Sequence, residues 1–194
     1  MEAESIVNSV LQSITYILPV GCQKDCWLVD CGDVDKLIEQ GWHVHGVLLT
    51  HAHFDHIYGL NRLMEIFSNA LVYTNAEGEK GLQNPKWNFS RYHEEIENFV
   101  LCKPENVRVL DAEGTLDLDG MPVDVLFTPG HEPSCISYRV DGRLFTGDSY
   151  IPGVNVVKTF PRSNKEQAVD SLARLQDLES SGLKIMPGHW IENK

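Results

Sequence analysis

Long apolar runs are missing from this sequence of 194 residues. The most apolar early stretch, residues 14–20, is short and contains Thr15 and Pro19, a composition that suits a strand. A membrane span needs about 20 apolar residues, and the acidic N-terminal residues do not lead into the apolar core of a secretion signal. We therefore expect a cytoplasmic protein that does not bind membranes.

Clusters of basic residues are missing as well. The chain has 16 Lys and Arg against 28 Asp and Glu, a formal net charge of −12, and its basic residues are scattered. A protein that binds nucleic acid needs a basic surface to displace counterions from the phosphates. The charge balance therefore argues against a nucleic acid and favours a small-molecule substrate.

Regularly spaced cysteines and flexible linkers are also absent. The five cysteines are odd in number and irregularly spaced, as expected in a reducing compartment. Cys22 and Cys26 are separated by three residues, but no second pair completes the four ligands of a structural zinc site. Because no repeat, low-complexity tract or Pro/Gly-rich linker divides the chain, we predict one domain spanning residues 1–194.

The spacing of apolar residues predicts both strands and helices. Strands are predicted at residues 13–20, 25–30, 44–50, 70–73, 107–110, 123–128, 135–140, 143–146 and 184–186. Helices are predicted at residues 34–40, 55–67 and 76–82, and from the cap Ser163, with Glu166 completing a capping box, to about Leu178. Residues 83–103 are predicted to be irregular and to lie over the site. Consecutive strands, with helices between and after them, favour an α+β sandwich with helices packed outside.

The densest group of metal-binding residue types lies at residues 50–56, which read Thr-His-Ala-His-Phe-Asp-His. Residues two apart in an extended segment point the same way, so His51 and His53 can converge on one ion. A turn into a helix at Asp55 would present this carboxylate and His56 from the other side. These four ligands can serve two metal ions but complete the coordination of neither.

Three later residues of metal-binding type can complete both coordination spheres. Each of them follows a predicted strand and a glycine. His131 follows Thr-Pro-Gly, Asp148 follows Phe-Thr-Gly, and His189 follows Met-Pro-Gly. Glycine beside a ligand lets the backbone approach a crowded centre and adopt positive φ. The combination predicts a metal site formed by His51, His53, Asp55, His56, His131, Asp148 and His189.

Other reactive side chains lack this context. His43 and His45 also form an HxH pair, but no Asp-His follows, and we expect a structural role at the start of their strand. We expect His93 to be solvated, with contact to substrate as the alternative. Cys135, although close to His131 in sequence, is expected to be a buried thiol rather than a nucleophile.

Residues 51–56, 128–131, 147–148 and 187–189 together resemble the motifs of the metallo-β-lactamase superfamily. The resemblance covers nearly the whole chain, from Val29-Asp30-Cys-Gly onward. It implies a four-layer αββα sandwich, with the metal site at one edge between the two sheets. It also implies that one ion is held by His51, His53 and His131, the other by Asp55, His56 and His189, with Asp148 bridging them.

Within this superfamily the sequence is most similar to the compact bacterial hydroxyacylglutathione hydrolases (glyoxalase II-like). Residues 84–90, the run from Leu144 through Asp148, and the helix after Ser163 carry this similarity. Two departures weigh against a glutathione thioester as substrate. Residues 157–163 replace the usual Gly-Arg-Thr-Asp-like turn, and the chain ends five residues after His189, before the C-terminal helical domain of full-length glyoxalase II enzymes.

The resemblance implies a hydrolase that uses hydroxide held by two zinc ions to cleave a small ester or thioester. Iron or manganese could replace zinc. Asp55 is the expected catalytic residue, since it can both bind metal and orient the nucleophile. Asp30 and Thr50 are expected to orient the ligand imidazoles. Candidate pocket residues are Tyr58, Trp87, Tyr92, Tyr150 and Lys158.

Several other functions remain open on the same residues. The main alternatives are a dioxygenase that uses one iron ion to oxidise glutathione persulfide, and a lactonase or β-lactamase-type hydrolase. A nuclease of the same superfamily is disfavoured by the acidic composition. A non-enzymatic metal-binding protein is disfavoured by the complete set of ligands.

Overall fold

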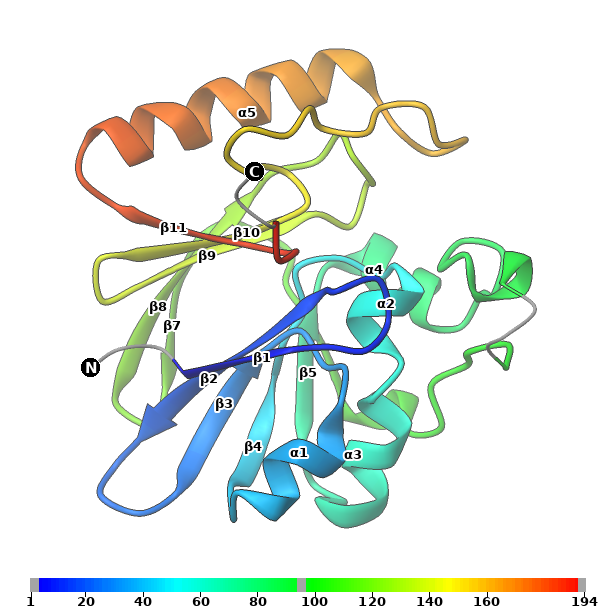
Figure 1. The fold of residues 1–194 in the computed structure, drawn as a ribbon, viewed down its shortest axis with the longest axis vertical. Coiled ribbons are helices and arrows are strands. Elements are labelled where there is room, and N and C mark those ends of the chain that lie inside the picture. The colour runs from blue at the N-terminus through cyan, green and yellow to red at the C-terminus, as the bar shows by residue number, and fades with distance from the viewer. Residues whose placement is uncertain (1–3, 94–96, 192–194) are drawn as a thin grey trace.

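The computed structural model describes residues 4–93 and 97–191, which form two facing sheets with helices on both outer faces (Figure 1). The first sheet runs in strand order: β1 (Glu4–Val7), β2 (Ile14–Val20), β3 (Asp25–Val29), β4 (His43–Leu48), β5 (Leu71–Thr74) and β6 (Val107–Val109). The second has the order β11 (Lys184–Pro187), β10 (Arg143–Gly147), β9 (Ile136–Val140), β8 (Met121–Phe127) and β7 (Gly114–Leu118).

Helices form the outer layers of the sandwich. The first sheet is covered by α1 (Val34–Glu39), α2 (Phe54–Ile57), α3 (Leu60–Ile66) and α4 (Ala76–Leu82), and the second by α5 (Lys165–Ser180) (Figure 1). The segment between α4 and β6 contains two short 3₁₀ turns, Ser90–Tyr92 and Pro104–Asn106. The predicted αββα arrangement is confirmed.

Three apolar clusters fill the interfaces between the four layers. Val47 and Leu48 are neighbours on β4, and because strand side chains alternate they point to opposite faces. Val47 packs with Leu63 of α3 in the outer cluster, whereas Leu48 packs with Tyr138 between the two sheets. Leu175 of α5 belongs to the third cluster, on the far side of the second sheet. Burying such a side chain contributes about 2 kcal/mol, so these interfaces fix the strands whose ends carry the site.

Two strands were not predicted, and both lie at sheet edges. Both strands are largely exposed, with three of the four β1 residues and three of the five β7 residues at the surface. β1 places one polar and one apolar residue on each face, so the alternation that signals a strand is absent there, and β7 alternates over only five residues. β1 pairs antiparallel with β2, and β7 pairs antiparallel with β8.

The single helix predicted over residues 55–67 is wrong, because it divides at Tyr58 and Gly59. The amide of Gly59 donates to the carbonyl of Cys31 (3.0 Å), and the carbonyl of Asp55 accepts from the Ser13 hydroxyl (2.7 Å). In a continuous helix the amide of Gly59 would donate to the carbonyl of Asp55, but here each of these two groups has another partner. A Cβ at Gly59 would lie 2.0 Å from the carbonyl oxygen of Gly32, so the close approach requires glycine.

The predicted cap of the last helix is also wrong by one residue. Asn164, not Ser163, caps α5, since its side-chain oxygen accepts from the amides of Glu166 and Gln167 at 3.1 Å each. The Ser163 hydroxyl instead donates to the carbonyl of His131 (2.7 Å). The residue expected to begin the helix thus supports a candidate ligand.

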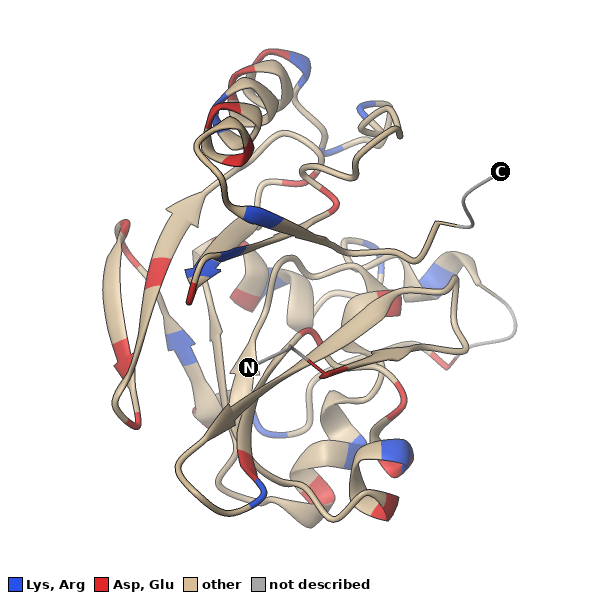
Figure 2. Ribbon diagram, turned by 60° about the vertical axis from the view of Figure 1, so that its left-hand side comes forward, with Lys and Arg blue, Asp and Glu red and all other residues tan. Residues whose placement is uncertain are grey.

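Charged side chains are dispersed over the fold. Lys and Arg lie among Asp and Glu on helices, loops and strands of both halves of the sandwich (Figure 2). Among the helices within residues 4–93 and 97–191, none is long and apolar enough to cross a membrane.

Candidate metal centre

The structure brings all seven predicted ligands together at one edge of the sandwich. They come from the loop after β4, from α2, and from the turns that follow β8, β10 and β11: His51, His53, Asp55, His56, His131, Asp148 and His189. β8 and β10 each pair antiparallel with β9, and β11 pairs parallel with β10. These three strands therefore end at the same edge of the sheet, although their ligands are far apart in sequence.

The glycines that precede the later ligands are needed for this approach. Gly147 has φ +50, and a Cβ there would lie 2.6 Å from the Thr50 hydroxyl oxygen. A Cβ at Gly188 would lie 2.4 Å from a carboxylate oxygen of Asp148 and 3.0 Å from the ring of His56. Any larger residue would push the turn away from the cluster.

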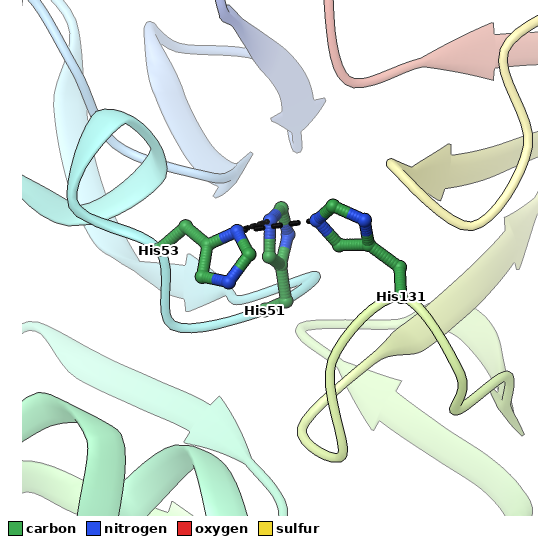
Figure 3. A group of neighbouring side chains, drawn as sticks. All are labelled: His51, His53 and His131. Atoms are coloured by element: carbon green, nitrogen blue, oxygen red, sulfur yellow. Dashed lines mark hydrogen bonds between the residues drawn. The ribbon is translucent and has the colours of Figure 1, made fainter. Parts of the chain in front are cut away.

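Three histidines form the first group of candidate ligands. The Nδ1 atom of His53 lies 3.1 Å from Nε2 of His51 and 3.2 Å from Nε2 of His131. Figure 3 shows the three rings pointing at one another from two separate segments of the chain. All three side chains are buried. This convergence of nitrogens matches the three protein ligands of a tetrahedral metal site with one open position.

Two carboxylates and two histidines form the second group. The Nε2 atoms of His56 and His189 are 3.2 Å apart, and one oxygen of Asp55 lies 3.4 Å from the first and 3.3 Å from the second. Asp148 has one oxygen 3.6 Å from Nε2 of His56, while its other oxygen lies 3.4 Å from Nε2 of His189 and 3.6 Å from Nε2 of His131. Asp148 thus reaches both groups, as a bridging ligand must.

Asp30 and Thr50 orient two of the imidazoles. The Asp30 carboxylate accepts from Nδ1 of His56 (2.8 Å) and from the backbone amide and the hydroxyl of Thr50 (2.7 Å each). Since the Thr50 hydroxyl donates to Asp30, its oxygen accepts from Nδ1 of His51 (3.1 Å). With Nδ1 held in this way in both rings, Nε2 is the nitrogen that faces the cluster and is placed to bind a metal ion.

Backbone carbonyls orient two further imidazoles, a feature that sequence reasoning missed. Nδ1 of His131 donates to the carbonyl of Val157 (3.0 Å), and Nδ1 of His189 donates to that of Leu11 (3.0 Å). Every residue has a carbonyl, so no sequence signal marks these two. Their effect on orientation is the same, because with Nδ1 bound to a carbonyl it is Nε2 that faces the cluster.

These tautomers allow a test of whether the first group fits a cation. The Nε2 atoms of His51 and His131 carry lone pairs, and a proton on Nδ1 of His53 could satisfy only one of them. Burial, followed by the charge that a protonated His131 would carry, lowers the pKa of His53 to about 3. Three neutral imidazoles with inward lone pairs fit a divalent ion. Without an ion, at least one of these buried nitrogens has no hydrogen-bond donor.

The second group fits a cation for the opposite reason, because it is held together by charge. Burial alone would raise the pKa of Asp148, but the hydrogen bond from His189 and the charge of His56 lower it to about 2. Burial would lower the pKa of His189, but hydrogen bonds to Asp148 and Asp55 raise it to about 10. Two ionised carboxylates therefore already attract positive charge to this point. The Oδ1 atom of Asp148, which is the oxygen nearer to His56, is buried and has no hydrogen-bond partner among the described residues.

A cavity of about 540 Å³ opens beside the cluster. Of the predicted pocket residues, Tyr92 lines this cavity, and so does His93, whose ring also packs on Phe54. Sequence reasoning missed five lining residues that carry no charge or metal-binding group: Leu11, Phe54, Phe89, Val157 and Phe160.

The other four predicted pocket residues lie outside this cavity, and their contacts explain why. The hydroxyl of Tyr58 donates to Asp33, and that of Tyr150 donates to Glu179 on α5. Trp87 lies under the guanidinium of Arg162, 4.0 Å from the ring centroid. Lys158 lines a separate groove beside the start of α5.

His43 and His45 lie at the opposite end of β4 from the cluster. Nδ1 of His43 lies 2.8 Å from the Asp25 carboxylate, and Nδ1 of His45 lies 2.7 Å from that of Asp119. The predicted structural role agrees with these contacts, although Asp25, His43 and His45 also place ligand atoms within 4.8 Å of one another. Cys135 is buried, and burial raises the pKa of its thiol, as expected for a structural cysteine.

Comparison with known sequences agrees with this geometry. The family model for the metallo-beta-lactamase superfamily matches residues 22–189, and the chain therefore belongs to that superfamily. A hydroxyacylglutathione hydrolase from Francisella philomiragia is 30% identical over 165 residues, which are 82% of this chain and 56% of that relative. The chain thus spans a little over half the length of that enzyme.

Solved structures confirm the fold. The crystal structure of BLEG-1 B3 metallo-beta-lactamase superposes with a TM-score of 0.85 at 24% identity, over 98% of this chain and 92% of that one. TTHA1623 in a di-iron-bound form superposes with a TM-score of 0.75 at 24% identity, over 97% and 92% of the two chains. The histidine and aspartate cluster and the family together support a divalent metal, without selecting zinc.

Proposed function

We propose that this protein is a hydrolase that binds two divalent ions, zinc by preference, and cleaves a small ester or thioester. The observation that carries the proposal is the pair of complete ligand groups joined by Asp148, whose oxygens lie 3.4–3.6 Å from nitrogens of both groups. One group offers three imidazoles, and the other offers two imidazoles and two carboxylates. Imidazole and carboxylate ligands of this kind suit zinc, and they also accept iron or manganese.

Divalent ions held by these groups would polarise the substrate carbonyl and allow water to act as a nucleophile at neutral pH. Asp55 both faces the second group and lines the cavity. Burial opposes its ionisation, but the charge of His56 and a hydrogen bond from His189 hold its pKa well below the ordinary value. Its carboxylate is therefore ionised and can accept a proton from the attacking water. In the overall reaction, water adds to the acyl carbon, the C–S or C–O bond breaks, and the thiol or alcohol leaves with a proton.

The second ligand group favours hydrolysis over the one-iron dioxygenase. A site for a single ion would need the first group or the second, whereas both groups are assembled here, the first buried and the second largely buried. Lactones and β-lactams present the same electrophilic carbonyl, so they belong in the same test as esters and thioesters.

The experiment is a panel of thioesters, lactones, β-lactams and phosphodiesters, assayed with metal-loaded wild type and His53→Ala. Asp170→Asn, on the exposed face of α5, is the matched control. We expect one carbonyl class to be hydrolysed, with loss of at least 100-fold in kcat/KM for His53→Ala and no change for the control. Equal rates in His53→Ala, or one iron per chain with oxygen uptake, would overturn the proposal.

A further inference from the structure

The cavity beside the metal centre is apolar apart from the candidate ligands. Five of its twelve lining residues belong to the ligand set. The others are His93 and six side chains that are aliphatic or aromatic: Leu11, Phe54, Phe89, Tyr92, Val157 and Phe160. A cavity of about 540 Å³ lined in this way is suited to an apolar ligand of moderate size.

Two phenyl rings form the wall next to the first group of ligands. The rings of Phe89 and Phe160 are 4.9 Å apart between centroids, with an interplanar angle of 44°. Both pack on His53, at 4.8 and 5.4 Å, and Phe160 also packs on His131 at 5.5 Å. Because the substrate carbonyl must lie at these histidines to meet the metal, its acyl substituent lies within reach of both rings.

The backbone at Phe89 is strained, which indicates that the position of its ring is functionally important. Phe89 has φ +65 and ψ −1, a left-handed conformation that costs a bulky residue about 1–3 kcal/mol. Buried Asn88 holds it there by donating to the carbonyls of Gly81 (3.0 Å) and Phe99 (3.1 Å) and accepting from the amide of Ser90 (3.0 Å). The surrounding loop therefore holds Phe89 in place against its own preference.

Among the described residues, no lysine or arginine side chain lines this cavity. Arg162 is paired with Glu77 and Glu132, and Lys158 lines the separate groove beside α5. Away from the metal centre, a charged group of the substrate would lose water here without gaining a lysine or arginine partner, a cost that selects against it. Glutathione carries two carboxylates, and the acyl group of a hydroxyacyl thioester carries a hydroxyl.

We propose that the substrate presents an uncharged, apolar acyl group to Phe89 and Phe160, such as an arylacetyl or branched aliphatic group, and that lactoyl-glutathione is a poor substrate. This inference rests on the proposed hydrolase function. It makes Phe89 and Phe160 the residues that determine acyl specificity. Neither touches the ligand groups through a hydrogen bond, so their effect is separable from metal binding.

The test is a matrix of four thioesters that separates the acyl group from the thiol. Phenylacetyl and lactoyl groups are each joined to N-acetylcysteamine, which is uncharged, and to glutathione. We expect kcat/KM for phenylacetyl-N-acetylcysteamine to exceed that for lactoyl-glutathione by at least about tenfold, the scale of an apolar contact in a pocket. With either thiol, the phenylacetyl thioester should be the better substrate.

Two variants assign the selectivity to the rings. Phe160→Ala and Phe89→Asn, in which asparagine tolerates the left-handed backbone, should lower kcat/KM for phenylacetyl thioesters about tenfold and for lactoyl thioesters less than threefold. Trp87→Leu removes an aromatic ring of the same loop outside the cavity. It should leave kcat/KM unchanged for both phenylacetyl and lactoyl thioesters. Metal content, measured alongside, should equal that of wild type in all three.

Each contrary outcome has a distinct meaning. If lactoyl-glutathione is the better substrate, or if both ring variants lower all four rates equally, the acyl-group inference fails while the hydrolase stands. If no thioester, ester or lactone is hydrolysed by protein with two ions per chain, the proposed function itself fails, and this inference with it.

Discussion

Replacing Asp30 with asparagine tests how the ligands are oriented without touching a ligand. Asp30 is buried, and its carboxylate accepts three hydrogen bonds, from Nδ1 of His56 and from the amide and hydroxyl of Thr50. Asparagine replaces one oxygen with an NH₂ group, which cannot accept from Nδ1 of His56. Its φ of +58 is one that asparagine tolerates, so backbone strain does not confuse the result.

The expected magnitude follows from the lost hydrogen bond. A hydrogen bond to a charged group is worth about 1.5–3 kcal/mol, and about 1.4 kcal/mol corresponds to a factor of ten. Without its carboxylate partner, His56 can place its proton on Nε2 and turn an N–H toward the second metal. We therefore expect the weaker-binding zinc ion to lose about 10–100-fold in affinity.

The assay is competition for zinc against a fluorescent chelator, with circular dichroism to confirm folding. Asp170→Asn is the matched control, because it makes the same chemical change on the exposed face of α5. If the Asp30→Asn protein is folded and binds both zinc ions with Kd values within threefold of wild type, the view that this carboxylate fixes the orientation of the His56 ring is refuted.

Three further predictions follow from other parts of the structure. Gly130→Ala should lower the free energy of unfolding by at least about 2 kcal/mol in urea, because φ is +135 and a Cβ would lie 2.2 Å from the backbone of α5; a loss below 0.5 kcal/mol would contradict this packing. Burial opposes ionisation of Asp33, but hydrogen bonds from Lys36, Tyr58 and Ser9 lower its pKa to about 2. Asp33→Asn should therefore destabilise metal-free protein by about 1 kcal/mol at pH 7, allowing for solvent screening, and the difference should fade as the pH drops from about 4 to about 2; a difference independent of pH would exclude this origin. Removing metal with a chelator should lower the melting temperature, since zinc at 100 times its Kd stabilises the folded state by about 2.7 kcal/mol, and an unchanged melting curve would show that the centre binds no ion when folded.

The three later candidate ligands could be predicted from the sequence because each is marked twice. His131, Asp148 and His189 are each the right residue type, and each follows a strand and a glycine. The sandwich could be predicted too, since strands such as β4 carry apolar residues that face both neighbouring layers. Asp30 and Thr50 could be proposed as orienting residues because acidic and hydroxyl side chains are the usual partners of ligand imidazoles.

The walls of the site could not be predicted, because its contacts are made by groups without a chemical signature. The carbonyls of Leu11 and Val157 hold two imidazoles, and any residue could supply them. Phe89 and Phe160 look like ordinary apolar residues until the fold places them beside His53. The tyrosines predicted to line the pocket include Tyr58 and Tyr150, whose hydroxyls donate hydrogen bonds elsewhere, to Asp33 and Glu179.

Metal content most directly tests the claim that two ligand groups share one site. Wild type loaded with zinc, desalted and measured by mass spectrometry should contain two ions per chain, and His43→Gln should contain the same number, which excludes the cluster at Asp25 as the source. His53→Ala and His189→Ala, each lacking a ligand of a different group, should each retain about one ion. A wild-type content of one ion or fewer, or two ions in both ligand variants, would contradict the account.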